Sequence, residues 1–193
     1  MKINPIPLKG SWKEGYALDR HTIYSVPLGE DQYGKMKYDT KRSEIGELLY
    51  QLKYNGQEDA VYDIIDLIVP FLKRWNIKNK VDLIIPAPPS KKRDYQPVYR
   101  IAEEMATLLE KCWVHDLLEK IDLGQMKDLS GDRKKEAIEN KIVKRRQFKR
   151  VVNILVVDDL YQSVTTLEEV CRVLKADHFV NHIYVLTMTK TKG

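Results

Sequence analysis

The chain has 193 residues, of which 43% are hydrophobic and 32% charged, and its formal net charge is +5. This length fits one large domain with a substantial core, or a domain with a small appendage. No stretch reaches the roughly 18 apolar residues of a membrane span, and the N-terminus lacks the apolar core of a signal peptide. The two cysteines, Cys112 and Cys171, lie far apart, so we expect reduced thiols in a cytoplasmic protein.

The first part of the chain, residues 1–42, is polar and aromatic, with Gly and Pro scattered through it. Residues 16–26 alternate in polarity as a strand does, and residues 29–34 predict a turn. We expect this segment to form an N-terminal arm or small sheet, followed by a main domain over residues 43–193.

Within the main domain, strands alternate with helices. We expect helices over residues 45–52, 61–72, 97–108 and 166–175. We expect strands over residues 81–86, 113–121, 153–157 and 181–188. Pro97 suits the first turn of a helix, whereas Pro70 should kink or end the helix that contains it. The alternation predicts an α/β fold with a mainly parallel sheet flanked by helices.

The positive charge is concentrated in residues 127–150, which hold ten basic and four acidic side chains. Residues 131–150 are weakly amphipathic, and we expect them to be helical in part. Such a stretch is most often a solvated surface, but it can also face nucleic acid or a phosphorylated ligand. Only Phe148 offers the aromatic stacking that single-strand binding usually needs, so nucleic acid ranks below the other interpretations.

The most informative segment is the apolar strand at residues 153–157, which is followed directly by Asp158 and Asp159. Hydroxyl-bearing residues come next, at the start of a helix: Tyr161, Ser163, Thr165 and Thr166. Free amides and the helix dipole favour a phosphate there, by about 0.3–1 kcal/mol for the dipole alone. The alternative is that Ser163 or Thr165 only caps the helix.

Other nucleotide sites are excluded by the positions of the glycines. The sequence contains no Gly-x-x-x-x-Gly-Lys-Ser/Thr loop and no Gly-x-Gly-x-x-Gly. Ligands of parallel sheets bind beyond the carboxyl ends of the strands, where the acidic pair and the loop of residues 87–96 both fall. One acidic and one basic loop at one sheet edge predict a pocket for a sugar phosphate.

The segment from Val156 to Leu167, Val-Val-Asp-Asp-Leu-Tyr-Gln-Ser-Val-Thr-Thr-Leu, resembles the phosphoribosyl-pyrophosphate signature of type I phosphoribosyltransferases. Its Asp-Asp-Leu-Tyr form is most similar to the ComF-like, competence-associated branch. Residues 50–56 and 85–93 support the resemblance, which extends over about residues 43–190. It implies the type I phosphoribosyltransferase fold and a homodimer.

The resemblance also implies roles for the matching positions. Asp158 and Asp159 are the catalytic pair, which binds the ribose hydroxyls. The 5′-phosphate is expected to contact Tyr161, Gln162, Ser163, Val164, Thr165 and Thr166. The pyrophosphate, with its Mg²⁺, is expected to contact Lys91, Lys92 and Arg93, while Arg133 lies near the diphosphate in a mobile hood. No side chain is singled out as a metal ligand.

Val164 departs from the family pattern, in which glycine is usual. If the loop needs a positive φ there, a β-branched residue costs about 1–3 kcal/mol. From the sequence we therefore expect Val164→Gly to bind phosphate esters more tightly. Nearby, Gln162 stands where close relatives often carry a basic residue.

Two functions remain open. The first is a Mg²⁺-dependent transferase that moves the phosphoribosyl group of phosphoribosyl pyrophosphate, or of another phosphorylated sugar, to an unidentified nitrogen acceptor. The second is a non-catalytic accessory protein that acts in DNA uptake through DNA or protein contacts. For the second, single-stranded DNA is expected to contact the basic residues Lys144, Arg145 and Arg146.

Overall fold

The computed structural model describes residues 3–89, 95–121 and 142–191. Its centre is a six-stranded sheet in the order β1-β2-β10-β9-β5-β6. These strands are β1 (Ile6–Pro7), β2 (Glu14–Arg20), β5 (Leu83–Pro86), β6 (Cys112–Trp113), β9 (Val152–Tyr161) and β10 (Val180–Lys190). All neighbours pair in parallel except β1 and β2. The predicted fold class, an α/β protein with a mainly parallel sheet, is confirmed.

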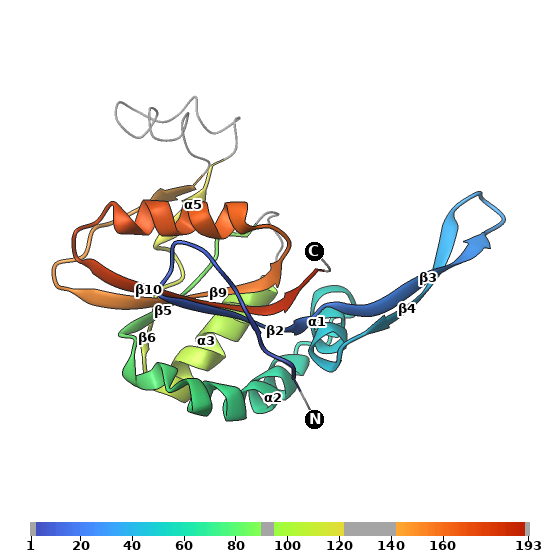
Figure 1. Cartoon of the computed structure of the whole chain (residues 1–193), viewed down its shortest axis with the longest axis horizontal. Helices are drawn as coiled ribbons and strands as arrows, with labels where there is room; N and C mark the ends of the chain where they lie inside the picture. The colour runs from blue at the N-terminus through green and yellow to red at the C-terminus, as the bar shows by residue number, and fades with distance from the viewer. Residues whose placement is uncertain (1–2, 90–94, 122–141, 192–193) are drawn as a thin grey trace.

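Helices cover both faces of this sheet (Figure 1). One face packs against α1 (Glu44–Tyr54), α2 (Ala60–Trp75) and α3 (Pro97–Leu109), and the other against α5 (Val164–Lys175). A short 3₁₀ helix, η1 (Ile77–Asn79), follows α2. Among the described helices, none is long and apolar enough to cross a membrane.

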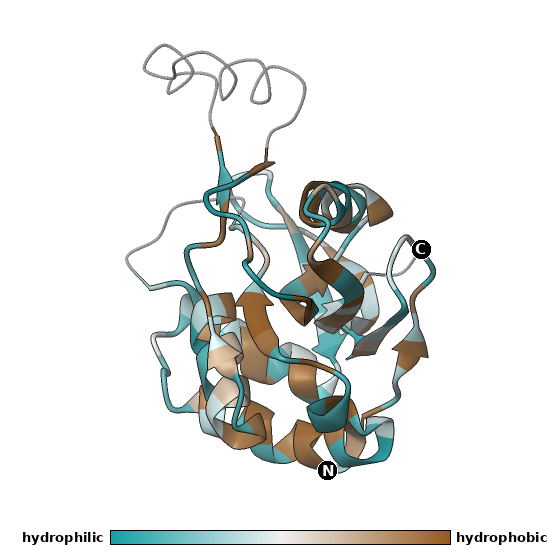
Figure 2. Cartoon of the chain, turned by 90° about the vertical axis from the view of Figure 1, so that its left-hand side faces the viewer, coloured by the Kyte–Doolittle hydropathy of each residue, from teal (hydrophilic) through white to brown (hydrophobic). Residues whose placement is uncertain are grey.

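The sheet separates two hydrophobic cores, and β9 contributes to both. Leu155 and Val157 belong to the core under α1, α2 and α3, whereas Ile154 and Val156 belong to the core under α5. Successive side chains of a strand point to opposite faces, so an apolar run with no polar interruption is what a doubly covered strand requires. Figure 2 shows these central strands as mostly hydrophobic, while the helices carry both kinds of residue.

The N-terminal segment of residues 1–42 is divided between two sheets. Strands β1 and β2 belong to the central sheet, whereas β3 (Thr22–Glu30) and β4 (Met36–Arg42) form an antiparallel hairpin that projects from the body (Figure 1). The single strand predicted over residues 16–26 is therefore wrong. The chain leaves the central sheet between β2 and β3, at His21, and local alternation cannot reveal such a change of sheet.

One other prediction needs correction, and two are tested only in part. Pro70 lies inside α2, which continues to Trp75, so the proline does not end the helix; Phe71 and Leu72 are buried, and their packing outweighs one missing hydrogen bond. The strand predicted over residues 113–121 is split into β6 and β7 (Leu118–Lys120), which belong to different sheets. The described end of the basic stretch, residues 142–150, contains no helix but the strand β8 (Ile142–Lys144), which pairs with β7; residues 131–141, where a helical part was also expected, lie outside the described residues.

A buried ion pair joins β8 to the end of α5. Lys144 Nζ contacts the carboxylate of Asp177, whose side chain is 1% exposed. The backbone amides of Phe148 and Phe179 donate to the same carboxylate at 2.8 and 3.0 Å. Burial by itself raises the pKa of Asp177, but the hydrogen bonds from Lys144 and the two amides outweigh it and lower the pKa to about 2.

Replacing Asp177 by asparagine is expected to destabilise the fold at pH 7 by about 3 kcal/mol, because it leaves the Lys144 ammonium buried without a counter-charge. The lowered pKa means that the carboxylate stabilises the fold above about pH 4, and that this advantage is lost as the pH falls towards 2. Urea unfolding of wild type and Asp177→Asn at pH 7 and pH 2.5 measures both effects.

The matched control is Asp116→Asn, which removes the carboxylate of an exposed ion pair with Arg146. An exposed pair contributes at most about 1 kcal/mol, so this variant should remain close to wild type. Equal losses in the two variants would contradict the special role of the buried pair.

Candidate functional site

The candidate site exists because two neighbouring strands end at different points. Strand β5 ends at Pro86, opposite Val157, whereas β9 stays paired with β10 as far as Tyr161. Within the described ranges, no strand therefore pairs with the β5 side of β9 from Asp158 onwards. A pocket of about 410 Å³ lies against this edge, a size typical of small-molecule sites.

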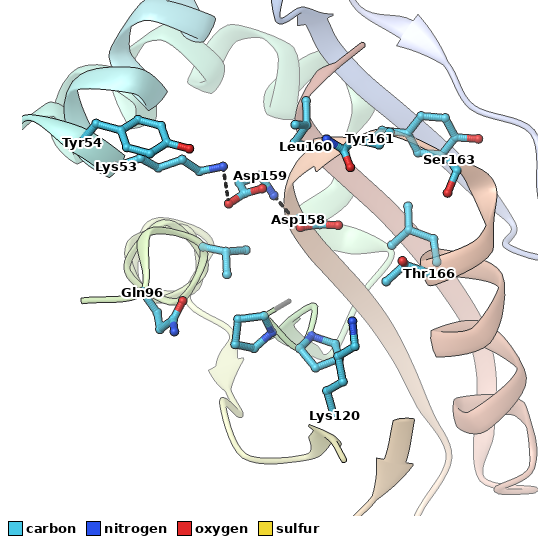
Figure 3. A pocket seen from close by; sticks show the side chains of 15 residues that line it. Lys53, Tyr54, Gln96, Lys120, Asp158, Asp159, Leu160, Tyr161, Ser163 and Thr166 are labelled. Carbon is cyan, nitrogen blue, oxygen red and sulfur yellow. Dashed lines mark hydrogen bonds and ion pairs between the residues drawn. The ribbon is translucent and has the colours of Figure 1, made fainter. Parts of the chain in front are cut away.

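The sequence predicted that the two adjacent carboxylates follow the strand. In the structure they are part of it, because β9 continues to Tyr161. Because side chains alternate along β9, Asp158 falls on the side of α5 and Asp159 on the side of α1. Figure 3 shows Asp159 directed towards Lys53 and Asp158 directed away from it, towards α5. Both still line the pocket, so a ligand at the strand edge contacts two carboxylates with different surroundings.

Asp158 is strongly affected by its surroundings. Its Oδ1 accepts a hydrogen bond from the backbone amide of Asp159 at 2.8 Å. Burial, followed by the neighbouring charge of Asp159, nevertheless raises the pKa of Asp158 to about 7. At neutral pH this carboxyl is thus available both as a hydrogen-bond donor and as an acceptor, depending on its proton.

Asp159 is held by a cation from another element. Lys53 Nζ lies 2.7 Å from Asp159 Oδ2, and the two side chains are only 12% and 23% exposed. Lys53 is in the last turn of α1, where the helix dipole favours a positive charge. The ion pair places α1 at the wall of the pocket, together with Tyr54.

The start of α1 is fixed tightly against the central sheet. The Ser43 hydroxyl caps the helix by accepting from the Gly46 amide at 3.1 Å, and the Ser43 amide donates to the His21 carbonyl. A Cβ atom at Gly46 would lie 2.3 Å from that carbonyl oxygen, so only glycine permits this approach. The position of Lys53 therefore depends on a glycine one helix length away.

A hydrogen-bonded chain lies behind the acidic pair. The His21 ring contacts the Thr189 hydroxyl at 3.2 Å, and the same hydroxyl donates to the Asp159 carbonyl at 3.2 Å. Burial, with Lys53 and Arg42 nearby, lowers the pKa of His21 and so favours its neutral form. This chain connects the base of the β3–β4 hairpin to the strand that carries the acids.

The N-terminus of α5 lines the pocket, and within the described residues no side chain of its N-cap residue caps the helix amides. Ser163 is the N-cap residue, but its side chain makes no capping hydrogen bond, and Thr165 is already within the helix. The interpretation that either residue serves only as a cap is therefore not supported. Free amides at a helix start provide a binding place for a phosphate or another anion.

Val164 is the first residue of α5, and its backbone does not have a positive φ. Among the described residues, only Asn76 and Glu110 combine a side chain with positive φ. The strain cost expected from the sequence is therefore absent, because the loop is shorter than predicted and the helix begins two residues earlier, at Val164 and not at Thr166.

Of the eight predicted site residues that the structure describes, six line the pocket. Those that line the pocket are Asp158, Asp159, Tyr161, Gln162, Ser163 and Thr166. Val164 and Thr165 do not line it, because they lie on another side of the first turn of α5. Lys91, Lys92, Arg93 and Arg133 fall outside the described residues, so their roles stay predictions.

Four polar lining residues were not among the predicted site residues: Lys53, Tyr54, Gln96 and Lys120. Lys53 and Tyr54 belong to the stretch of residues 50–56 that resembles the family, so a signal was present, but no role was attached to it. Gln96 precedes α3 and ends the loop of residues 87–96, which the sequence placed at the predicted pocket without a role for Gln96 itself. Lys120 ends β7, and nothing in its local sequence indicates a site, so only the fold brings it to this edge of β9.

The described side chains do not form a metal site by themselves. No group of three or more His, Cys, Asp or Glu residues that could hold an ion occurs within the described ranges. Mg²⁺ favours an octahedron of oxygen ligands, whereas the pocket offers two carboxylates, one of which is already paired with Lys53. A magnesium site made of protein groups alone is therefore a poor fit to this pocket.

The basic residues considered for DNA binding are engaged within the chain. Lys144 pairs with Asp177, Arg145 with Glu119 at 2.8 Å, and Arg146 with Asp116. The described part of the basic stretch thus presents less unbalanced positive charge than its sequence indicates. Neutralising these three residues would also break ion pairs, so it is not a clean test of DNA binding.

No family model matches the chain, and no curated protein matches it. One solved structure similar to it is an adenine phosphoribosyltransferase, with 13% identity, a TM-score of 0.42, and 85% of this chain and 94% of that chain covered. The adenine phosphoribosyltransferase from Thermoanaerobacter pseudethanolicus is 12% identical with a TM-score of 0.42, and the match covers 87% of this chain and 95% of that chain. The UMP synthase of Leishmania donovani is 12% identical with a TM-score of 0.40, and the match spans 83% of this chain but only 27% of the synthase. These values describe a loose similarity in the arrangement of elements.

Asp158→Asn is expected to stabilise the fold at alkaline pH. Because the folded state raises the pKa of Asp158 to about 7, ionising this carboxyl costs stability as the pH rises from 4 through 7. The variant avoids that cost, and at pH 8 we expect it to be more stable than wild type by roughly 2–4 kcal/mol, with little difference at pH 4. Denaturant unfolding at both pH values measures this.

Asp39→Asn on the exposed hairpin is the control for that experiment, and it should change stability by less than about 0.5 kcal/mol at either pH. A variant Asp158→Asn that is less stable than wild type at pH 8 would show that the ionised carboxylate is a net stabilising group.

Val164→Gly is expected to leave the affinity for ribose 5-phosphate within about twofold of wild type, because Val164 already has helical backbone geometry. It should cost at most about 1 kcal/mol of stability, the usual effect of glycine in a helix. Titration calorimetry and thermal unfolding measure the two effects, with Thr165→Gly as the matched control. Tenfold tighter binding in Val164→Gly alone would restore the interpretation that valine obstructs the phosphate.

Proposed function

We propose that this pocket binds phosphoribosyl pyrophosphate and that the protein transfers the phosphoribosyl group to a nitrogen acceptor. The observation that supports this most directly is the combination found in one pocket: two carboxylates at the end of β9 and the uncapped N-terminus of α5. Ribose hydroxyls suit the carboxylates, and a 5′-phosphate suits the helix amides. The signature resemblance of residues 156–167 supports the same assignment.

The ribose ring of the ligand is proposed to lie between Asp158 and Asp159 on one side and the start of α5 on the other. An ionised carboxylate accepts hydrogen bonds from vicinal hydroxyls, and such charge-assisted bonds are about twice as strong as neutral ones. The Ser163 and Thr166 hydroxyls line the same part of the pocket and add donors for the phosphate. This places the two ends of a ribose 5-phosphate on separate, chemically matched walls.

The proposed reaction breaks the bond between the anomeric carbon and pyrophosphate and forms a bond to nitrogen. Positive charge develops on the sugar in the transition state, and the two fixed carboxylates are placed to stabilise it. The leaving pyrophosphate needs cations: Lys120 lines the pocket, and the predicted groups Lys91, Lys92 and Arg93 follow β5 in the sequence. We propose that Mg²⁺ is held by the diphosphate and not by a protein site.

The acceptor, a homodimer, a cytoplasmic location and the accessory role in DNA uptake all stay predictions. The transferase is preferred to the accessory role because the acidic pair has a pocket, whereas the described basic residues proposed for DNA are ion-paired. Salt-dependent binding of single-stranded DNA by the whole chain, with no binding of phosphoribosyl pyrophosphate, would reverse this preference.

Calorimetric titration of the protein with phosphoribosyl pyrophosphate and Mg²⁺ tests the proposal. We expect saturable binding, and a loss of about 10- to 100-fold in affinity for Asp159→Asn, which removes a charged acceptor for a ribose hydroxyl. Glu14→Gln is the control, because Glu14 pairs with Lys80 and Trp75 away from the pocket and should leave the affinity unchanged. The absence of detectable binding at millimolar ligand would overturn the proposed function.

A further inference from the structure

The pocket already contains a cation supplied by the protein. Lys53 reaches from the last turn of α1 to Asp159, with Nζ 2.7 Å from Oδ2, and its side chain is only 12% exposed (Figure 3). An ammonium group in this place neutralises the carboxylate that a divalent ion would otherwise approach. The ion pair is thus more than a surface contact, because both partners face the ligand cavity.

The ammonium group is held there by the architecture around α1. The helix is anchored at its start by the Ser43 cap and by the close approach of Gly46 to the His21 carbonyl. On the other side, the Thr189 hydroxyl fixes the backbone of Asp159 by donating a hydrogen bond to the Asp159 carbonyl. Both partners of the ion pair therefore belong to rigid elements, and the pairing needs no loop rearrangement.

A free divalent ion would find few ligands in this pocket. Within the described ranges there is no cluster of three or more His, Cys, Asp or Glu residues, and one of the two acids is paired with Lys53. A metal ion that approaches Asp159 would meet a partly buried ammonium group already bound to the same carboxylate, which repels it. An ion that arrives with its own phosphate oxygens does not depend on those carboxylates for its ligands.

We propose that Lys53 is the resident counter-ion of Asp159 and that it excludes free divalent cations from the pocket. Lys53 thereby acts as a positioning and specificity-determining residue: it keeps the acidic pair available for ribose hydroxyls and admits metal only as a complex with the phosphates of the ligand. The proposal concerns the pocket of the proposed function, but its test requires no ribose ligand.

The test is binding of Mn²⁺ alone, measured by electron paramagnetic resonance and by calorimetry with the full chain at pH 8. Wild type is expected to bind Mn²⁺ weakly. Lys53→Met, which keeps the length of the side chain but removes its charge, is expected to bind it at least 10-fold more tightly. Lys53→Arg retains the cation and should behave as wild type.

Two further variants identify the place of the gained site. Lys53→Met combined with Asp159→Asn should lose the tighter binding again, because the freed carboxylate is gone. Lys80→Met breaks another lysine–carboxylate pair, with Glu14 at 2.9 Å outside the pocket, and should not gain Mn²⁺ affinity. Circular dichroism of each variant establishes that it is folded, and Lys53→Gln replaces Lys53→Met if the latter does not fold.

Equal Mn²⁺ affinity in wild type and Lys53→Met, or gained affinity that survives the added Asp159→Asn change, would overturn the proposal. Failure of the proposed function has a different signature: phosphoribosyl pyrophosphate would not bind to wild type, while the Mn²⁺ difference between wild type and Lys53→Met would remain.

Discussion

The pairing of β9 between β5 and β10 is the constraint on which the rest of this molecule depends. A strand with neighbours on both edges and helices on both faces must be apolar along its length, and β9 meets that requirement from Ile154 to Val157, where it pairs with both β5 and β10. Where β5 stops, β9 loses one neighbour but keeps the other. Polar side chains cost less free energy at this point because they line a pocket and are not buried in a core, and the acidic pair lies here.

The same strand geometry gives two identical side chains different properties. Alternation directs Asp158 and Asp159 to opposite faces of the sheet, so Asp158 lies on the side of α5 and Asp159 meets the cation on α1. Burial raises the pKa of Asp158 to about 7, whereas Asp159 is held in an ion pair with Lys53. Ionising the Asp158 carboxyl costs stability in the protein without ligand. Such groups are common in binding sites, because a ligand can supply the hydrogen bonds that the carboxyl lacks.

Positioning of the site relies on contacts between distant parts of the chain. The Gly46 approach to His21, the Thr189 hydroxyl between His21 and Asp159, and the Lys53–Asp159 pair connect the hairpin base, α1, β10 and β9. The first is a close steric fit, and the other two are polar contacts. Together they make α1 a structural part of the pocket and not only a cover for the core.

The sequence by itself determined the fold class, the central strand, most helices and the candidate acids, because apolar periodicity and the order of elements are local properties. It also placed Tyr161, Gln162, Ser163 and Thr166 near the acids. Only the tertiary structure decided that β9 continues through the acidic pair, that Val164 begins a helix without strain, and that Lys144 is buried against Asp177. It also decided that Lys53 meets Asp159, since the two residues are far apart in the chain and only the packing of α1 on the sheet brings an ammonium group to a particular carboxylate.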